Sequence, residues 1–229
     1  MSFGDYKVLD GISLGIAERE IVGILGPNGA GKTTYMNLLT GALTPTSGRV
    51  RLMGEDVTAL DTASRCQRGL SRTHQVPRPF LHMTVFENVL VAVCHGRVEQ
   101  AADPMGDAWA VLEETGMAHV ANRPAETLGL LDRKRLELSR ALAANPKVLL
   151  LDEIGGGLTD AEGDALVALI RSIHARGVTI IWIEHIMRLL VATCSRLVCM
   201  AGGAVLADGD PQDVLDAPAV RSAYFGAAA

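Results

Sequence analysis

The segment Gly26-Pro27-Asn28-Gly29-Ala30-Gly31-Lys32-Thr33 fits G-x-x-x-x-G-K-[ST], the pattern of a phosphate-binding loop. It lies between the apolar run Ile21–Leu25 and a helical pattern, which is the context that this loop requires. The glycines allow backbone N–H groups to surround an anion, and the amino end of the helix adds about half a positive charge. A simple glycine turn would give no reason for a lysine at the start of a helix, where the dipole disfavours it. We therefore predict a phosphate site in which Lys32 reaches the outer phosphates and Thr33 can ligate Mg²⁺.

Two acidic residues, Asp152 and Glu153, follow a second apolar run at 148–151. Neighbouring side chains diverge at a strand end, so one carboxylate can face Mg²⁺ while the next faces the water that attacks the γ-phosphate. Taken alone, such a pair is often a solvated corner of the fold. With the phosphate loop present, we predict that Asp152 ligates the metal and that Glu153 polarises the water.

Short apolar runs alternate with helical patterns along most of the chain. A third run lies at 178–183, and helical spacing occurs at 33–39, 109–115, 136–144 and 161–175. This alternation predicts an α/β fold with a parallel sheet. Between 75 and 145 the helical pattern dominates, which indicates a helical insertion. Residues 196–208 are typical of two strands turning at Gly202-Gly203, followed by helices that begin near Pro211 and Pro218.

Composition and charge exclude several classes of protein. The 229 residues carry 21 Lys and Arg against 26 Asp and Glu, a net charge of −5, so we expect no nucleic-acid partner. The first residues lack the layout of a signal peptide, and no uncharged apolar stretch reaches the roughly 18 residues of a membrane helix. The four cysteines lack C-x-x-C spacing and are expected to be reduced thiols. These features predict a cytoplasmic chain that does not itself cross a membrane.

With these elements in place, the chain resembles the ATP-binding subunits of ABC transporters. Gln75 resembles the Q-loop glutamine, which in this family touches Mg²⁺ and senses the membrane partner. His185 resembles the switch histidine, which in the family contacts the γ-phosphate. The resemblance implies an α/β P-loop NTPase (RecA-like) core with a helical subdomain and a partial antiparallel β-subdomain. It implies one ABC ATPase domain over 1–229. The N-terminal part is expected at 1–75 and a helical signature subdomain at 76–145. A third part at 146–229 is expected to hold the second Walker element, the switch histidine, the hairpin and the final helices.

The resemblance also implies site residues, position by position. As catalytic residues it implies Glu153, His185 and Lys32. As ATP-binding residues it implies Phe3, Asn28, Gly29, Ala30, Gly31, Lys32, Thr33, Thr34, Gln75 and His185. As ligands of Mg²⁺ it implies Thr33, Gln75 and Asp152.

Within the superfamily, four segments resemble the LivG-like cassettes of branched-chain amino-acid importers. They are Arg72-Thr73-His74-Gln75, residues 83–89, Gly157-Leu158-Thr159 and the ending Ala223-Tyr224-Phe225-Gly226. The resemblance implies ATP hydrolysis that drives transport, permease subunits in the membrane, a second ATP-binding subunit, and an external solute-binding protein as an indirect partner. The subunit would then be peripheral on the inner face of the cell membrane. Related cassettes serve urea, amide, aromatic-acid and lipopolysaccharide transport, so the cargo and the direction of transport stay open.

Two other kinds of nucleotide-hydrolysing or nucleotide-binding protein are alternatives to a transport subunit. A soluble ABC-type ATPase that acts on ribosomes or DNA usually joins two cassettes or carries a coiled-coil insertion, and a basic surface would be expected. This chain has one cassette, no long heptad tract and a negative net charge. A P-loop kinase or GTPase would leave Gln75 and His185 without a role, and a guanine-reading N-K-x-D segment is absent from the sequence.

The family signature LSGGQ aligns with Leu128-Gly129-Leu130-Leu131-Asp132, where only the leucine is retained. In the family, the signature of one subunit closes over ATP held by the other. Losing one hydrogen bond to a charged group costs about 1.5 to 3 kcal/mol. A carboxylate about 4 Å from a phosphate oxygen is repelled by roughly 4 kcal/mol at an effective dielectric constant of 20. We therefore predict a heterodimer, in which this chain supplies a sound Walker site to a partner's intact signature, although a homodimer stays open. Asp132 is also expected to cap a helix that begins near Arg133.

Two further departures concern the ends of the site. The aromatic residue that stacks on adenine in the family aligns with Phe3, with Tyr6 as a substitute, and the family has an extra strand ahead of it. Ile154 stands where the family usually has proline, and Thr159 stands where it has aspartate, with Asp160 next. Which of Thr159 and Asp160 contacts an opposing subunit stays open.

Overall fold

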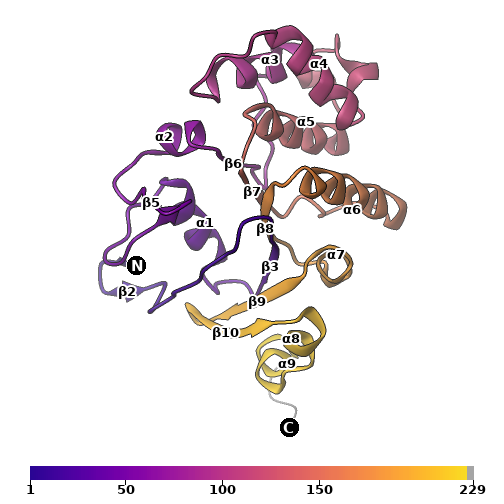
Figure 1. The fold of residues 1–229 in the computed structure, drawn as a ribbon. Helices are drawn as coiled ribbons and strands as arrows, with labels where there is room; N and C mark the ends of the chain where they lie inside the picture. The colour runs from indigo at the N-terminus through magenta and orange to yellow at the C-terminus, as the bar shows by residue number, and fades with distance from the viewer. Residues whose placement is uncertain (226–229) are drawn as a thin grey trace.

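A computed structural model describes residues 1–225 (Figure 1). Gly226 of the ending named above lies outside the described residues. The central sheet has six strands in the order β10-β9-β3-β8-β7-β6. Neighbouring strands are parallel except that β10 is antiparallel to β9. The strands are β3 (Ile21–Leu25), β6 (Leu70–Arg72), β7 (Val148–Asp152), β8 (Thr179–Ile183), β9 (Arg196–Ala201) and β10 (Ala204–Gly209). This sheet confirms the predicted α/β class.

The central strands are buried on both faces, as their continuous apolar runs predict. All five residues of β3 and of β8 are buried. The register places Asp152 beside Ile183 and Ile24 beside Ile183. Because the strands are parallel, the loops that follow β3, β7 and β8 leave the sheet at the same edge. The phosphate loop, Glu153 and His185 are therefore brought to one edge.

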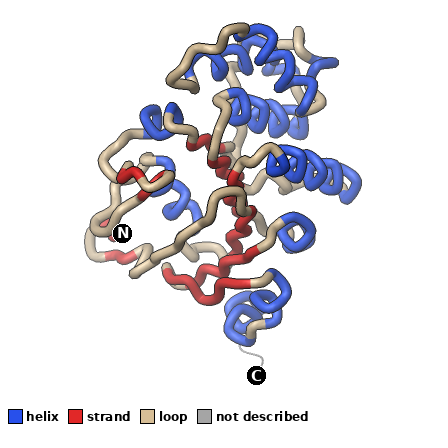
Figure 2. Tube along the Cα trace, viewed as in Figure 1, coloured by secondary structure: helices blue, strands red, loops and turns tan. Residues whose placement is uncertain are grey.

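Helices cover both faces of the sheet, and further helices form a separate region at one end (Figure 2). Helix α1 packs on one face with residues of β3 and β8, and α6 and α7 pack on the other. Helices α3, α4 and α5 pack against one another, with two short 3-10 turns before α5. The elements are α1 (Lys32–Thr40), α2 (Thr62–Gln67), α3 (Val85–His95), α4 (Pro104–Glu114), η1 (Ala118–Val120), η2 (Ala125–Thr127), α5 (Leu130–Ala143), α6 (Asp160–Ala175), α7 (Met187–Thr193), α8 (Pro211–Asp216) and α9 (Pro218–Phe225). In the described part of the chain, no helix has the length and apolarity needed to cross a bilayer.

The N-terminal part forms two small antiparallel pairs. β1 (Ser2–Phe3) pairs with β2 (Tyr6–Lys7), and β4 (Arg51–Leu52) pairs with β5 (Glu55–Asp56). The segment between β2 and β3 is not part of any sheet in the described residues (Figure 2). These two pairs make up the partial antiparallel β-subdomain that the sequence predicts.

Two local expectations differ from the structure. Strand β6 was not predicted, because its three residues, Leu-Ser-Arg, are too few and too polar to form an apolar run. The expectation that Asp132 caps a helix near Arg133 is wrong. Helix α5 begins at Leu130, its N-cap is Gly129 without a side-chain hydrogen bond, and Asp132 lies within the first turn. An acidic residue there still favours the helix dipole.

Candidate functional site

The phosphate loop lies between β3 and α1. Gly31 is the N-cap of α1 with φ 95°, a left-handed conformation that glycine adopts without a side-chain penalty. The Nζ atom of Lys32 donates hydrogen bonds to the carbonyl oxygens of Gly26, at 2.7 Å, and Pro27, at 3.1 Å. Lys32 is buried, and this burial lowers its pKa, while the nearby Glu153 carboxylate opposes part of the effect. The ammonium group is thus held over the loop that it is expected to serve.

The other loop residues named from the sequence differ in accessibility. Asn28, Gly29 and Thr33 are exposed, and Thr34 is half-buried. Ala30 is buried, and its N–H donates to the carbonyl of Pro27 at 3.2 Å. Thr33, whose hydroxyl is predicted to ligate Mg²⁺, is therefore among the exposed residues.

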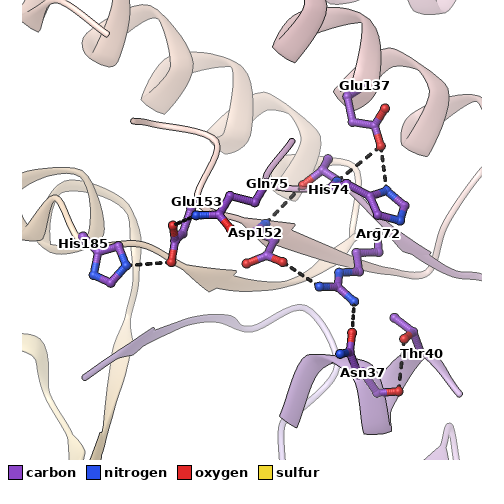
Figure 3. Close-up of polar contacts among 10 residues, drawn as sticks. Asn37, Thr40, Arg72, His74, Gln75, Glu137, Asp152, Glu153 and His185 are labelled. Atoms are coloured by element: carbon purple, nitrogen blue, oxygen red, sulfur yellow. Dashed lines mark hydrogen bonds and ion pairs between the residues drawn. The ribbon is translucent and has the colours of Figure 1, made fainter. Parts of the chain in front are cut away.

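Asp152 ends β7 and is paired with an arginine that sequence reasoning missed as a site residue. The Oδ2 atom of Asp152 lies 2.6 Å from Arg72, whose second nitrogen donates to Asn37 of α1 at 2.6 Å (Figure 3). The backbone N–H of Asp152 donates to Thr73 at 3.1 Å. Arg72 lies in β6, next to β7, so the parallel pairing of these strands brings the two charges together. The R-T-H-Q segment contained this signal, because its arginine lies three residues before Gln75.

Glu153 lies at the centre of the site and contacts both residues predicted from the family resemblance. His185 Nε2 lies 2.6 Å from Glu153 Oε1, and the side-chain amide of Gln75 donates to Oε2 (Figure 3). Glu153 has φ 50°, one of four non-glycine residues with positive φ in the described part of the chain. Such strain is concentrated at functional sites. The structure therefore brings Glu153, Gln75 and His185 together.

A second glutamate, Glu184, anchors the loops on either side of this cluster and was not identified from the sequence. Its side chain is buried, with Oε2 accepting from the N–H of Gly155 at 2.8 Å and Oε1 accepting from the N–H of His185 at 2.8 Å. A Cβ atom at Gly155 would lie 2.5 Å from Leu189 and 2.7 Å from Glu184, so any larger residue there would displace these side chains. One carboxylate thus holds both Gly155, two residues after Glu153, and the switch histidine.

A third glutamate, Glu137 of α5, anchors the loop that carries Gln75. Glu137 Oε1 lies 2.8 Å from His74 Nδ1, and Oε2 lies 3.2 Å from Arg140 (Figure 3 shows the first contact). Burial raises the pKa of Glu137, but the hydrogen bond from His74 and the charge of Arg140 outweigh it and hold the pKa below its ordinary value. Arg140 also lies 4.9 Å from the ring centre of Phe80. The Gln75 loop is therefore fixed to the helical region.

The degenerate signature lies where the 3-10 turns enter α5. Leu130 is exposed, and in the same helix Lys134 donates to the carbonyl of Gly156, after β7. Burial lowers the pKa of Lys134.

Thr159 caps α6 in a reciprocal pair with Glu162, and Asp160 pairs with Arg188 at 3.1 Å. Thr159 thus has a local structural role.

The two aromatic candidates for adenine stacking lie opposite each other in the β1–β2 pair. Phe3 is 50% exposed and Tyr6 is 71% exposed. Both side chains are exposed, and the role of Phe3 stays a prediction.

The family model described as ABC transporter matches residues 9–155. The chain belongs to the ABC transporter family. It is 38% identical to the branched-chain amino acid transport ATP-binding protein BraF of Pseudomonas aeruginosa, over all of this chain and 95% of that protein. It is 33% identical to the lipopolysaccharide export ATP-binding protein LptB of Haemophilus influenzae, over 98% of this chain and 93% of that one.

The solved structures agree with this assignment. The ADP conformation of MJ1267, an ATP-binding cassette of an ABC transporter, superposes with a TM-score of 0.90 at 30% identity, covering 99% of this chain and 95% of that one. These matches confirm the predicted P-loop NTPase fold, the LivG-like resemblance and the ATPase class. The chain is an ABC transporter ATP-binding subunit, of the kind that works with membrane-spanning subunits.

The residues assigned to Mg²⁺ fit that ion chemically. Thr33, Gln75 and Asp152 would supply hydroxyl, amide and carboxylate oxygens, the hard donors that Mg²⁺ prefers. Arg72 uses only Oδ2 of Asp152, and in the described part of the chain Oδ1 accepts no hydrogen bond. Asp152 therefore keeps an oxygen for a metal.

Proposed function

We propose that this subunit binds and hydrolyses ATP with Mg²⁺ to drive an importer of branched-chain amino acids or related small amides or acids. The observation that carries the proposal is the meeting of Glu153 with Gln75 and His185 at the edge that also holds the phosphate loop. The cargo assignment is supported by the 38% identity to BraF, which exceeds the 33% identity to LptB. The subunit would lie on the cytoplasmic face of the membrane, against permease subunits fed by an external solute-binding protein.

Different residues would bind the phosphates, hold Mg²⁺ and accept the proton of the attacking water. Lys32 would exchange its two loop carbonyls for phosphate oxygens, and the N–H groups of 28–33 would hold the same phosphates. Thr33, Gln75 and Asp152 would hold Mg²⁺, which supplies charge neutralisation on the phosphates when bound. Glu153 would orient the attacking water and accept its proton, since His185 and Gln75 fix both oxygens of its carboxylate. His185 would also support the γ-phosphate.

Replacement of Glu153 by glutamine tests this assignment. The amide keeps the shape of the side chain but cannot accept the proton, so turnover should fall by at least about 10²-fold while ATP binding is retained. The measurement is phosphate release by the detergent-extracted complex, with nucleotide binding followed by titration. Glu99→Gln is the matched control, because Glu99 is exposed and has no hydrogen-bond partner in the described residues. Near-normal turnover of Glu153→Gln would remove Glu153 from the mechanism.

We further propose that the subunit works as half of a heterodimer. The degenerate signature supports this, since Gly129 has no hydroxyl and Asp132 places a carboxylate in the first turn of α5. The purified chain alone should then hydrolyse ATP without cooperativity, and Asp132→Asn should raise its rate by removing the repulsion that keeps two copies of the chain from closing over ATP. Cooperative hydrolysis by the chain alone, unaffected by Asp132→Asn, would overturn the heterodimer.

A further inference from the structure

The strand next to β7 holds both the backbone and the side chain of Asp152. The backbone N–H of Asp152 donates to the hydroxyl of Thr73 at 3.1 Å, and Arg72 donates to Oδ2 of the carboxylate at 2.6 Å. The N–H of Thr73 donates to the carbonyl of Leu150 at 2.9 Å, which continues the parallel pairing of β6 with β7. The carboxylate is therefore fixed from one side, through one of its two oxygens.

Arg72 also reaches helix α1, which begins at the phosphate loop. Its Nη1 atom donates to Oδ1 of Asn37 at 2.6 Å, while Nη2 makes the contact with Asp152 (Figure 3). Asn37 lies four residues after Thr33, and residues with this spacing are neighbours on one face of a helix. One guanidinium group thus connects the end of β7 to the face of α1 that carries Thr33.

The contacts of Arg72 are largely shielded from water. The side chains of Arg72 and Asp152 are 13% and 6% exposed, and the Nε atom of Arg72 is buried without a hydrogen-bond partner in the part of the chain that the structure describes. A buried donor without an acceptor destabilises the folded state, and a buried ion pair often stabilises it no more than apolar side chains of the same size. Stability alone is therefore a weak reason for an arginine at this position.

The elements that Arg72 connects are those that supply two of the residues assigned to Mg²⁺. Thr33 belongs to α1 and Asp152 ends β7, so the separation of these two side chains depends on contacts between the helix and the strand. In a planar guanidinium group, the two terminal nitrogens have a fixed separation. Contacts from Arg72 to both sides therefore restrict the distance between the helix and the strand end.

We propose that Arg72 is a positioning residue for Mg²⁺. By holding Oδ2 of Asp152 it leaves Oδ1 to the metal, and by holding Asn37 it keeps Thr33 at a distance that one ion can bridge. Arg72 itself touches neither ATP nor the metal. This role rests on the proposed function, because it needs ATP and Mg²⁺ at the site. A purely structural ion pair would instead affect ATP binding equally with and without the metal.

The test compares ATP binding by Arg72→Lys with and without Mg²⁺. Lysine keeps the positive charge but lacks the two separately placed nitrogens. Titration of the full chain with N-methylanthraniloyl-ATP measures nucleotide affinity, first in EDTA and then in excess Mg²⁺. We expect the affinity in EDTA to change by less than about twofold and the affinity in Mg²⁺ to fall by at least about tenfold, as for loss of a residue that orients a metal ligand. The free Mg²⁺ concentration that gives half-maximal phosphate release should rise by a similar factor.

A second variant, Asn37→Ala, removes the contact with α1 and leaves the pair of Arg72 with Asp152 in place. It should also weaken binding in Mg²⁺ but not in EDTA. Combined with Arg72→Lys it should add little, because both changes break the same connection. Arg68→Lys is the matched control, since Arg68 contacts Glu55 at 3.3 Å and no residue assigned to the site. Circular dichroism verifies that each variant is folded.

Equal loss of affinity in EDTA and in Mg²⁺ for Arg72→Lys, or no loss in either condition, would overturn the proposal. An Asn37→Ala variant with the Mg²⁺ dependence of the unchanged protein would overturn it as well. Failure of the unchanged protein to bind ATP in Mg²⁺ is a different result, because it would refute the proposed function together with this role.

Discussion

Replacing Glu184 by alanine removes the acceptor of two backbone N–H groups, that of Gly155, which is buried, and that of His185, which is partly buried. Both hydrogen bonds are 2.8 Å long and Glu184 is 1% exposed, so water cannot replace the carboxylate without opening the site. A buried donor left without a partner costs about 1 to 3 kcal/mol, and the partly buried one costs less, so the free energy of unfolding should fall by about 1 to 4 kcal/mol. Glu184→Gln keeps one acceptor oxygen and should lose about half as much.

The same substitutions should affect turnover, because Glu184 holds the backbone of the residue whose ring contacts Glu153. In Glu184→Gln, one of the two N–H groups faces an amide donor, and the position of His185 or of the Gly155 turn is no longer fixed. We expect kcat to fall at least about tenfold with little change in the affinity for ATP, as for loss of orientation in a preorganised site. This split separates positioning from a purely structural role, which would lower the amount of active protein without changing the affinity or kcat per folded molecule.

Urea unfolding measures the stability, and phosphate release per folded molecule measures turnover. Glu99→Ala is the control, because this exposed residue has no partner in the described part of the chain and should change stability by no more than about 0.5 kcal/mol. If Glu184→Gln had the stability and turnover of the unchanged protein, the two 2.8 Å contacts would not anchor the site, and the reasoning would be refuted.

Two further predictions concern groups away from the nucleotide. Hydrogen bonds from Arg196 hold the pKa of Asp208 below its ordinary value of 3.8, so this pair should stabilise the protein above pH 3.8 and lose its effect as the pH falls through the lower, folded value. The urea midpoints of the unchanged protein and of Asp208→Asn should therefore converge in acid, and a difference independent of pH would contradict the argument. Burial raises the pKa of the Cys194 thiol to about 12, so iodoacetamide at pH 8 should label exposed Cys94 and leave Cys194 unmodified, as peptide mass spectrometry can show. Rapid labelling of Cys194 in folded protein would show that it is not protected.

Much of the sheet could be predicted, because buried parallel strands are continuous apolar runs. Strands β3, β7 and β8 lie where such runs occur, and the loops that follow them carry the predicted site residues. Strand β6 escaped prediction because it is short and polar, and its burial comes from its neighbour β7. A pattern in one segment contains no information on a neighbour that is distant in the sequence.

The site residues that motifs predicted lie within a few residues of the end of a strand, as Lys32, Glu153 and His185 do after β3, β7 and β8. The partners that hold them were missed, since Arg72, Glu137 and Glu184 owe their roles to contacts across the fold. Asp132 was misplaced for a related reason. A helix start depends on where the backbone turns, and the turn preceding α5 ends at Gly129, one full helical turn before Arg133.

The anchoring contacts share one arrangement. Gln75 and His185 each hold one oxygen of Glu153, and the backbone beside each of them is bound to a buried glutamate, Glu137 for the first and Glu184 for the second. Glu137 belongs to α5, whereas Glu184 follows β8 in the core. The carboxylate of Glu153 therefore lies between a contact fixed to the helical region and a contact fixed to the sheet. A rotation of the helical region relative to the sheet would move Gln75 but not His185, so it would change the orientation of Glu153 before it altered any residue of the phosphate loop.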